Sequence, residues 1–185
     1  VKKEVCPDNS FGVGLRLSAA AARELRGGIA AFKTFLEERG LYVFTITGFP
    51  YGEFHGPSVK QQAYQPDWSH NERLDYTRAL ADILAELLPE GGMGSVSTLP
   101  LCYGKQATDR MFANLATAAA HLEHVHARTG RQILLGLEPE PDCYLEKTGE
   151  AIDCMRRLAS LSPAAARYIG VCLDTCHAAV EQESP

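Results

Sequence analysis

Residues 170–177 read GVCLDTCH, an apolar run that leads directly to a carboxylate, Asp174, and three residues later to a histidine, His177. Residues 134–138, LLGLE, end in the same way, because Glu138 follows a leucine at the end of an apolar run. Runs of this kind are typical of buried strands in parallel sheets. The two stretches therefore predict two strands that each carry an acid at the C-terminal end.

Working outward from these stretches, the chain alternates short β-like runs with helical patterns. The predicted strands are residues 11–18, 41–49, 94–103, 132–141 and 168–177. The predicted helices are residues 19–40, a helix that a Ser69/Glu72 capping box begins, residues 109–129, residues 150–161 and a short helix from Pro163. Alternation of this kind predicts parallel strands joined by right-handed crossovers, so an α/β fold.

The spacing of the units suits either an open doubly wound sheet or a (β/α)₈ TIM barrel. No glycine fingerprint for a phosphate loop follows the first strand, which weakens the nucleotide-binding form of the open sheet. A barrel needs eight strands and about five β/α units are visible. We therefore expect residues 1–185 to form a single, incomplete TIM barrel domain with sequence missing after Pro185; the alternative is a self-contained open parallel sheet.

Composition narrows the class of partner. The chain has 185 residues and a net charge of −5, from 18 basic and 23 acidic residues, with no run of Lys and Arg, so nucleic acid is not an expected partner. No apolar run approaches the roughly 20 residues of a membrane helix. The six cysteines form no CxxC pair and no export signal is visible, which favours reduced thiols and a cytoplasmic protein. The sequence leaves the oligomeric state open.

The repeated strand-end acids point to a metal. Parallel strands lie about 4.8 Å apart, so Glu138 and Asp174 would nearly touch at the edge of the sheet where α/β active sites lie. Like charges this close raise each other's pKa unless a cation lies between them. A divalent metal held by Glu138 and Asp174 would offset this repulsion. His177 would be a further ligand or the group that orients a bound water. The alternative is that each acid only caps the helix that follows it.

Four further residues are candidate substrate contacts. A loop of about twenty residues follows the second strand, and a loop of that length inside a domain is more often functional than idle. The candidates are His55 and Trp68 in or beside that loop, Tyr103 at the end of the third strand, and Glu140 beyond the fourth. The histidines at 121, 124 and 126 fall late in a crossover helix, which predicts a solvated face away from the site.

These residues resemble a known family. GVCLDTCHA (170–178) is similar to the strand of endonuclease IV that bears an Asp and a His metal ligand, and LGLEPEP (135–141) is similar to the strand that bears its bridging Glu. The sequence thus resembles the xylose isomerase-like TIM barrel superfamily, which includes endonuclease IV as well as sugar-phosphate isomerases and epimerases. The stretches FGVGLRLS, GFPYGEFHG and STLPLCYG further resemble the metabolite traffic protein EboE branch.

The resemblance implies a metal-dependent barrel with Glu138 and Asp174 as ligands and His177 as ligand or catalytic neighbour. The superfamily completes its metal site with a His and a carboxylate on later strands, and none follows Pro185. The endonuclease branch also needs histidines at early strand ends, where this chain has Ser18, Thr47 to Phe49, and Pro100 to Leu101. A trinuclear phosphodiesterase site is therefore not expected.

The resemblance implies a sugar isomerase or epimerase that depends on a divalent metal (Mn, Zn, Co or Mg) and acts on a small sugar or polyol. Glu138 and His177 would be the groups that move a proton between adjacent carbons. Two alternatives stay open: a non-catalytic protein that binds or traffics a metabolite on the same barrel, and an endonuclease IV-type phosphodiesterase.

Overall fold

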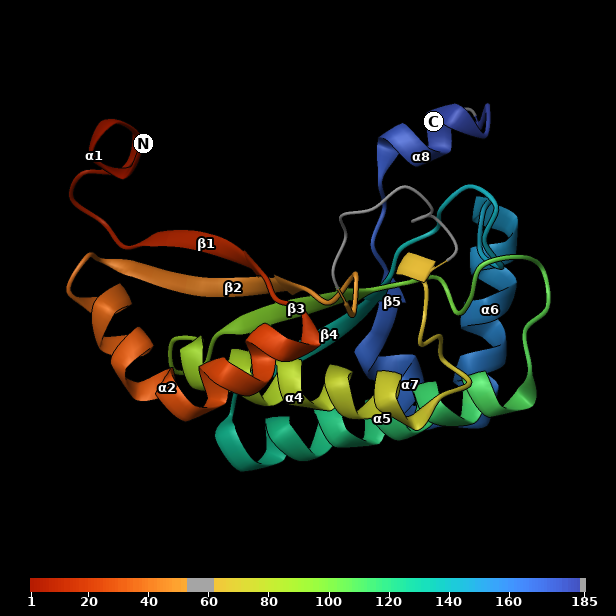
Figure 1. Ribbon diagram of the computed structural model, residues 1–185, viewed down its shortest axis with the longest axis horizontal. Helices are drawn as coiled ribbons and strands as arrows, with labels where there is room; N and C mark the ends of the chain where they lie inside the picture. Colours follow the sequence, from red (N-terminus) through yellow and green to blue (C-terminus); the bar gives the residue numbers. More distant parts are fainter. Residues whose placement is uncertain (53–61, 184–185) are drawn as a thin grey trace.

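The computed structural model describes residues 1–52 and 62–183. Its centre is one sheet of five parallel strands in the order β1-β2-β3-β4-β5 (Figure 1). The strands are β1 (Phe11–Arg16), β2 (Leu41–Thr47), β3 (Met93–Thr98), β4 (Gln132–Leu137) and β5 (Ile169–Val171). The helices are α1 (Lys2–Val5), α2 (Ala19–Glu37), α4 (Asn71–Leu87), α5 (Asp109–Thr129), α6 (Thr148–Leu161), α7 (Pro163–Tyr168) and α8 (Thr175–Val180).

The strand order decides between the two predicted architectures. Every strand pairs with the next one along the chain and all pairs are parallel, as in an arc of a barrel. A doubly wound sheet would instead reverse its strand order at a switch point. The predicted α/β fold is therefore confirmed, and the described residues form an incomplete barrel, with five strands where a closed TIM barrel has eight.

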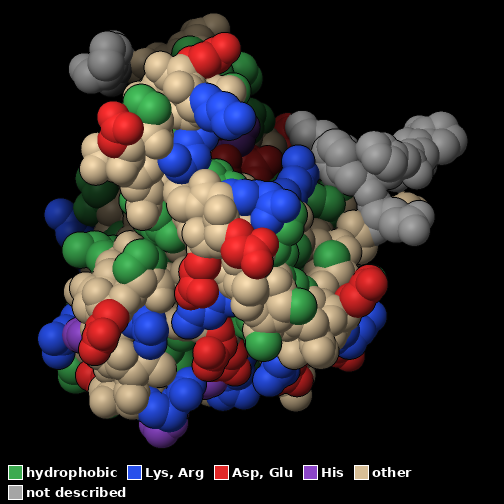
Figure 2. Space-filling model, turned by 90° about the vertical axis from the view of Figure 1, so that its left-hand side faces the viewer, with side chains coloured by type: hydrophobic (Ala, Val, Ile, Leu, Met, Phe, Trp, Pro, Cys, Tyr) green, Lys and Arg blue, Asp and Glu red, His purple; other side chains and the backbone are tan. Residues whose placement is uncertain are grey.

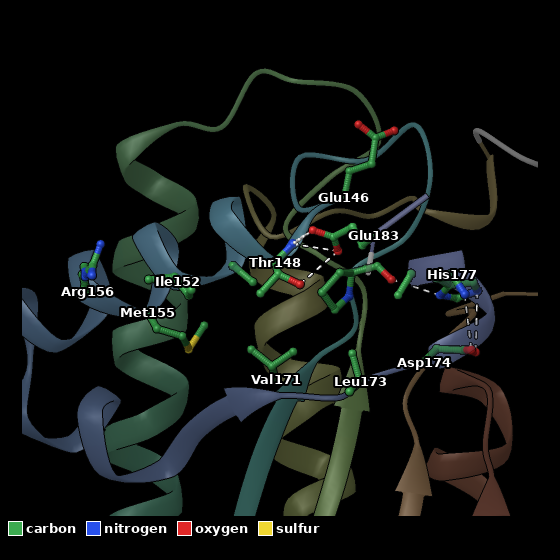
Figure 3. Close-up of a pocket in the computed structure, with 13 residues that line it drawn as sticks. Glu146, Thr148, Ile152, Met155, Arg156, Val171, Leu173, Asp174, His177 and Glu183 are labelled. Atoms are coloured by element: carbon green, nitrogen blue, oxygen red, sulfur yellow. Dashed lines mark hydrogen bonds and ion pairs between the residues drawn. The ribbon is translucent and has the colours of Figure 1, made fainter. Parts of the chain in front are cut away.

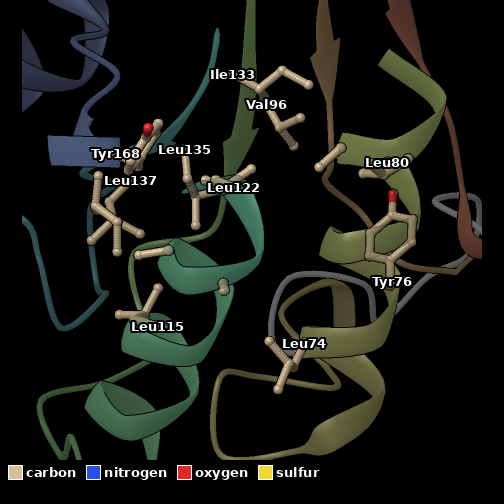
Figure 4. Close-up of a cluster of buried hydrophobic side chains, with 14 of the residues drawn as sticks. Leu74, Tyr76, Leu80, Val96, Leu115, Leu122, Ile133, Leu135, Leu137 and Tyr168 are labelled. Carbon is tan, nitrogen blue, oxygen red and sulfur yellow. The ribbon is translucent and has the colours of Figure 1, made fainter. Parts of the chain in front are cut away.

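One face of the sheet is covered by helices and forms the core. Figure 4 shows Leu80 of α4 and Leu122 of α5 packing toward Val96 and Leu135 of the sheet, and all four side chains are buried. Successive residues of a strand point to opposite faces, so alternate positions of each strand join this core. The buried side chains form a single cluster, and removing their apolar surface from water is the main force that holds the helices on the sheet.

The opposite face combines small and polar side chains with apolar ones such as Leu134. A hollow of about 510 Å³ lies on this inner face, and its wall includes Thr45, Thr47, Ser95, Ser97, Gly136 and Cys172. The Thr45 and Ser95 hydroxyls lie 2.9 Å apart in a hydrogen bond between neighbouring strands. At Gly12 a side-chain carbon would come within 2.9 Å of the Phe44 ring, so this position leaves no room for a larger residue.

The structure ends every strand earlier than predicted, the first at Arg16, the second at Thr47 and the fourth at Leu137. The third ends at Thr98 rather than at residue 103, because the chain turns at Leu99–Cys102 and Leu101 takes a left-handed conformation with φ 70°. The fifth pairs over three residues only. Val171, its last residue, and Leu173 read as buried but are 43% and 68% exposed. Both line a pocket whose wall also includes Ile152 and Met155 of α6.

The predicted capping box is also wrong. The Ser69 hydroxyl donates to Asp67 at 2.5 Å instead of capping α4, and His70 occupies the N-cap position. On the face shown in Figure 2, basic and acidic side chains are interspersed rather than gathered by sign. None of the described helices combines the length and the apolar character that a membrane crossing needs.

Candidate metal centre

The pairing of β4 with β5 brings the two strand-end acids to one edge of the sheet. The last ladder contact joins Leu137 to Val171, and the Cys172 N–H donates to the Leu137 carbonyl at 2.8 Å. On the other side of β4, the Glu138 N–H donates to the Thr98 carbonyl at 3.1 Å. Glu138 is thereby fixed between β3 and β5, one residue beyond the end of its strand.

Glu138, Asp174 and His177 converge at this edge. One ligand atom from each lies within 4.8 Å of the others, and all three residues are half-buried. In the part of the chain that the structure describes, no other group of three His, Cys, Asp or Glu residues meets this spacing. The structure thus brings together the three residues that the sequence predicted as metal ligands.

Asp174 uses its two carboxylate oxygens for different purposes. Oδ1 accepts the backbone N–H groups of Cys176 at 2.7 Å and His177 at 3.4 Å, which caps the N-terminus of α8. Oδ2 faces the His177 Nε2 atom at 3.7 Å. The Cys176 N–H is the main reason that the Asp174 pKa lies below its usual range, so this carboxylate is ionised. The cap, which the sequence posed as the alternative to a metal site, is present, and it leaves Oδ2 free of the α8 backbone.

The His177 ring is oriented by a backbone carbonyl. Nδ1 lies 2.9 Å from the Pro139 oxygen, which can only accept, so Nδ1 carries the proton. In the neutral ring the lone pair therefore belongs to Nε2, the atom that faces Asp174. A histidine with one nitrogen tied to a carbonyl and the other free to ligate is the usual form of a metal-binding histidine.

Glu138 has the opposite electrostatic character to Asp174. Burial raises its pKa, and the nearby charges of Glu140 and Asp174 raise it further, whereas His177 lowers it. An ionised Glu138 in this position is costly unless a cation offsets the cost. Two carboxylates and an imidazole nitrogen are a donor set that suits zinc and other divalent metals, and three protein ligands leave a position open for water or substrate. The residues present therefore fit a divalent metal.

The three side chains line two different pockets. Glu138 lines the hollow on the inner face of the sheet. Asp174 and His177 lie at one end of a second pocket, of about 440 Å³, whose apolar wall includes Ile152, Met155, Val171 and Leu173 (Figure 3). The surface that lines this second pocket is mostly apolar. The hollow on the inner face presents hydroxyl groups, so it suits a polar substrate better.

The four predicted substrate residues have different outcomes. Tyr103 is half-buried and packs its ring against Tyr64, and Glu140 accepts a hydrogen bond from the Tyr64 hydroxyl. Trp68 is fully buried, so it has no surface with which to contact a substrate, and we leave it out of the site. His55 lies outside the described residues.

Sequence reasoning missed two residues near the site. Tyr64 reaches Glu140 from a segment 76 positions earlier in the chain, and no local pattern marks that contact. Arg16, the last residue of β1, carries a charge that lowers the Glu138 pKa. Gly12, Gly14 and Arg16 alternate with the apolar residues Val13 and Leu15, so they share one face of the strand. A charged side chain at the end of that face was the signal that could have identified Arg16.

Comparisons with known proteins support the fold. No family model matches the chain, and no curated protein matches it. Among solved structures, the IolI protein with a bound zinc atom superposes with a TM-score of 0.57 at 14% identity, over 94% of this chain and 56% of that one. The probable 3-DHS dehydratase AsbF of petrobactin synthesis from Bacillus anthracis gives a TM-score of 0.53 at 11% identity, over 92% and 55%.

The chain thus spans little more than half the length of either protein, as an incomplete barrel would. At these identities the likeness concerns the fold and not the chemistry. The resemblance to the EboE branch stays a prediction. The fold is the one shared with IolI and AsbF, represented in this chain by five consecutive parallel strands.

Proposed function

We propose that this chain carries the metal-binding part of an isomerase or epimerase that acts on a small sugar or polyol. The observation that carries the proposal is the convergence of Glu138, Asp174 and His177 at the carboxyl end of β4 and β5. The zinc atom held by IolI, a protein of the same fold, supports a divalent metal in this family of barrels.

Each side chain has a role that its surroundings suit. Asp174 is ionised and fixed by the α8 backbone, so it would be a permanent anionic ligand. His177 would ligate through Nε2, because Nδ1 is committed to Pro139. Glu138, whose pKa is raised by burial, holds a proton more readily than Asp174 and would exchange it with a substrate carbon or hydroxyl. A bound divalent metal would polarise a substrate carbonyl or hydroxyl.

The surroundings of the three residues also bear on substrate class and compartment. The inner hollow beside Glu138 presents the Thr47 and Ser97 hydroxyls, which suit a substrate with several hydroxyl groups. All six cysteines are free in the structure, which supports a reducing compartment and hence the cytoplasm.

Metal content of the purified full-length protein tests the proposal. We expect near-stoichiometric Mn, Zn, Co or Fe in the wild type by elemental analysis, and its loss in a Glu138→Gln, Asp174→Asn double variant. A Glu37→Gln, Asp153→Asn double variant makes the same chemical changes at exposed positions of α2 and α6 that lie outside the candidate site, and it should keep the metal. Metal absent from the wild type after addition of each ion would contradict the proposal and favour a metabolite-binding protein.

Isomerase chemistry has its own readout. A proton moved between adjacent carbons exchanges with solvent, so a metal-loaded sample in D₂O should introduce deuterium beside the carbonyl of a substrate ketose. Nuclear magnetic resonance over a panel of ketoses and aldoses would detect it. A protein that binds the metal and a sugar but catalyses no exchange would be a binding or trafficking protein, and hydrolysis of abasic-site DNA would indicate a phosphodiesterase.

A further inference from the structure

Helix α8 carries His177 but has no buried side chain of its own. None of its six residues is buried, so the hydrophobic core does not hold this helix in place. A helix of this length is also too short to persist in water by itself. The position of α8, and with it the position of the His177 ring, therefore depends on polar contacts at its two ends.

The first turn of α8 is held at the candidate metal centre. Asp174 accepts the Cys176 N–H at 2.7 Å, and the His177 Nδ1 atom lies 2.9 Å from the Pro139 carbonyl oxygen. Both contacts involve the first turn only. The last turn needs a separate anchor if the helix is to keep one position.

The last turn of α8 is closed by a tight backbone turn that leads to Glu183. Gln182 has a left-handed conformation with φ 58°, and its N–H donates to the Ala179 carbonyl at 3.1 Å. The Glu183 N–H donates to the Ala178 carbonyl at 3.1 Å. These two bonds form a Schellman motif, in which glycine is the usual left-handed residue. A glutamine is less favourable there, but the motif fixes the backbone of Glu183.

The Glu183 carboxylate binds the first residue of α6. Its two oxygens lie 2.9 and 3.1 Å from the Thr148 nitrogen, and one of them also accepts the Thr148 hydroxyl at 2.9 Å (Figure 3). The N–H groups that begin a helix attract a carboxylate. The Lys147 ammonium, 3.8 Å from the Glu181 carboxylate, adds a second ionic contact between the same segments.

Helix α6 is a firm support for these contacts. It buries Cys154 and Leu158 in the hydrophobic core, so its N-terminus has a fixed position. The pocket of about 440 Å³ is lined by residues of both α6 and α8, and the Glu183–Thr148 contact lies on its wall together with His177 (Figure 3). The Glu183 carboxylate thus joins the two helices beside the space that separates them.

We propose that Glu183 is a positioning residue that docks α8 on the N-terminus of α6 and thereby holds His177 in place to bind the divalent metal. This inference rests on the proposed function, since it requires a metal at Glu138, Asp174 and His177. Groups that orient a metal ligand without touching the metal commonly change metal affinity by about 10-fold or more when they are removed.

The test removes the contact from either side and measures the Co²⁺ affinity of the full-length protein by competition with a chromophoric chelator. Thr148→Pro removes both donors to Glu183 and changes no charge, and proline is favoured at the first position of a helix. The extended backbone of Lys147, with φ −115° and ψ 157°, accommodates a proline after it. Glu183→Ala removes the acceptor and tests the same contact if the proline variant does not fold.

We expect each of the two substitutions to weaken Co²⁺ binding about 10-fold. The double variant should bind Co²⁺ no more weakly than Glu183→Ala alone, because both substitutions remove the same contact. Asn71→Pro is the matched control, since it places a proline at the first residue of α4, outside the candidate site, and it should leave Co²⁺ affinity unchanged.

His177 provides a readout that a general effect on stability would not change. In a His177→Ala background, Thr148→Pro should leave Co²⁺ affinity as it is, because the ligand that Glu183 positions is gone. The visible absorption of bound Co²⁺ should shift in Thr148→Pro toward that of the His177→Ala variant. Equal weakening by Thr148→Pro with and without His177 would mean that Glu183 stabilises the fold in general, and it would overturn the inference.

Failure of the proposed function would look different. Co²⁺ affinity that is absent in the wild type, or unchanged by the Glu138→Gln, Asp174→Asn double variant, would overturn the metal centre and the inference with it. Normal dependence on Glu138 and Asp174 with wild-type affinity in Thr148→Pro and in Glu183→Ala would overturn the role of Glu183 alone.

Discussion

The two faces of the sheet are built from neighbouring residues of the same strands, yet they have opposite character. In β4, Leu135 is fully buried against the helices, whereas Leu134, one position earlier, lines the hollow on the other face. In β3, Val96 is buried while Ser95 and Ser97 present hydroxyls to that hollow. The helix-facing side therefore contributes most of the stability of the fold, and the inner side leaves room for polar groups and ends at the candidate metal centre.

The largest expected effect separates the two faces directly. Leu135→Ala should lower the free energy of unfolding by about 3 kcal/mol, since it leaves a cavity in a packed core. Leu134→Ala, the same change on the hollow side, should lower it by about 1 kcal/mol or less. Equilibrium unfolding in urea measures both. Equal losses of unfolding free energy in the two variants would show that the inner face is also packed in the full-length protein. The two faces would then contribute equally to stability.

At the candidate metal centre we expect a smaller effect on stability, and in the stabilising direction. Glu138→Gln should raise the melting temperature of the metal-free protein by about 2 °C at neutral pH. The pKa of Glu138 is raised in the folded state, so its ionisation weakens the fold as pH rises through that pKa. Below its ordinary value both states are protonated and the gain should vanish, which thermal unfolding at about pH 4 and pH 7.5 would check.

Glu146→Gln is the matched control for that prediction. Glu146 lies after the same strand, but its carboxylate is 2.7 Å from the Lys105 ammonium and its pKa is lowered by that contact. The substitution should therefore give no gain at neutral pH. A melting temperature that rises in both variants would show that any loss of negative charge in this loop stabilises the protein, whatever its position.

The smallest expected effect lies on the helix side, far from the centre. Burial opposes ionisation of Asp82, but the hydrogen bond from His121 at 3.0 Å and the charges of His121, Arg26 and Arg128 outweigh it and lower its pKa. Asp82→Asn should thus cost about 0.5 kcal/mol, because the group is partly exposed. The loss should be present above the ordinary Asp pKa and fade as pH falls through the lowered one, as urea unfolding at several pH values would show.

The sequence predicted the parts of the site that depend on local pattern. Glu138 and Asp174 were found because an acid after an apolar run marks the end of a parallel strand, and that rule needs no tertiary knowledge. It could not show that Asp174 would both cap α8 and face His177, because this depends on how its two oxygens are oriented.

Contacts between distant segments were not predictable in this way. Tyr64 reaches Glu140 across 76 positions, and His121, expected on a solvated face, bonds to Asp82 because α4 and α5 pack side by side. The apolar pattern of Val171 and Leu173 predicted burial, but whether a strand's side chains are covered depends on what packs against it. The sequence pattern therefore predicts the helices and strands, whereas the contacts between their faces depend on tertiary packing.

The double use of Asp174 has a thermodynamic consequence. A six-residue helix such as α8 is too short to be stable by itself, so its first turn depends on the Asp174 cap. An ion bound through the other oxygen would hold the same carboxylate in place. By thermodynamic linkage, any change that stabilises the folded form of α8 should then also raise the affinity for the ion. Slowed amide hydrogen exchange at Cys176 and His177 would then report occupancy of the centre without any substrate.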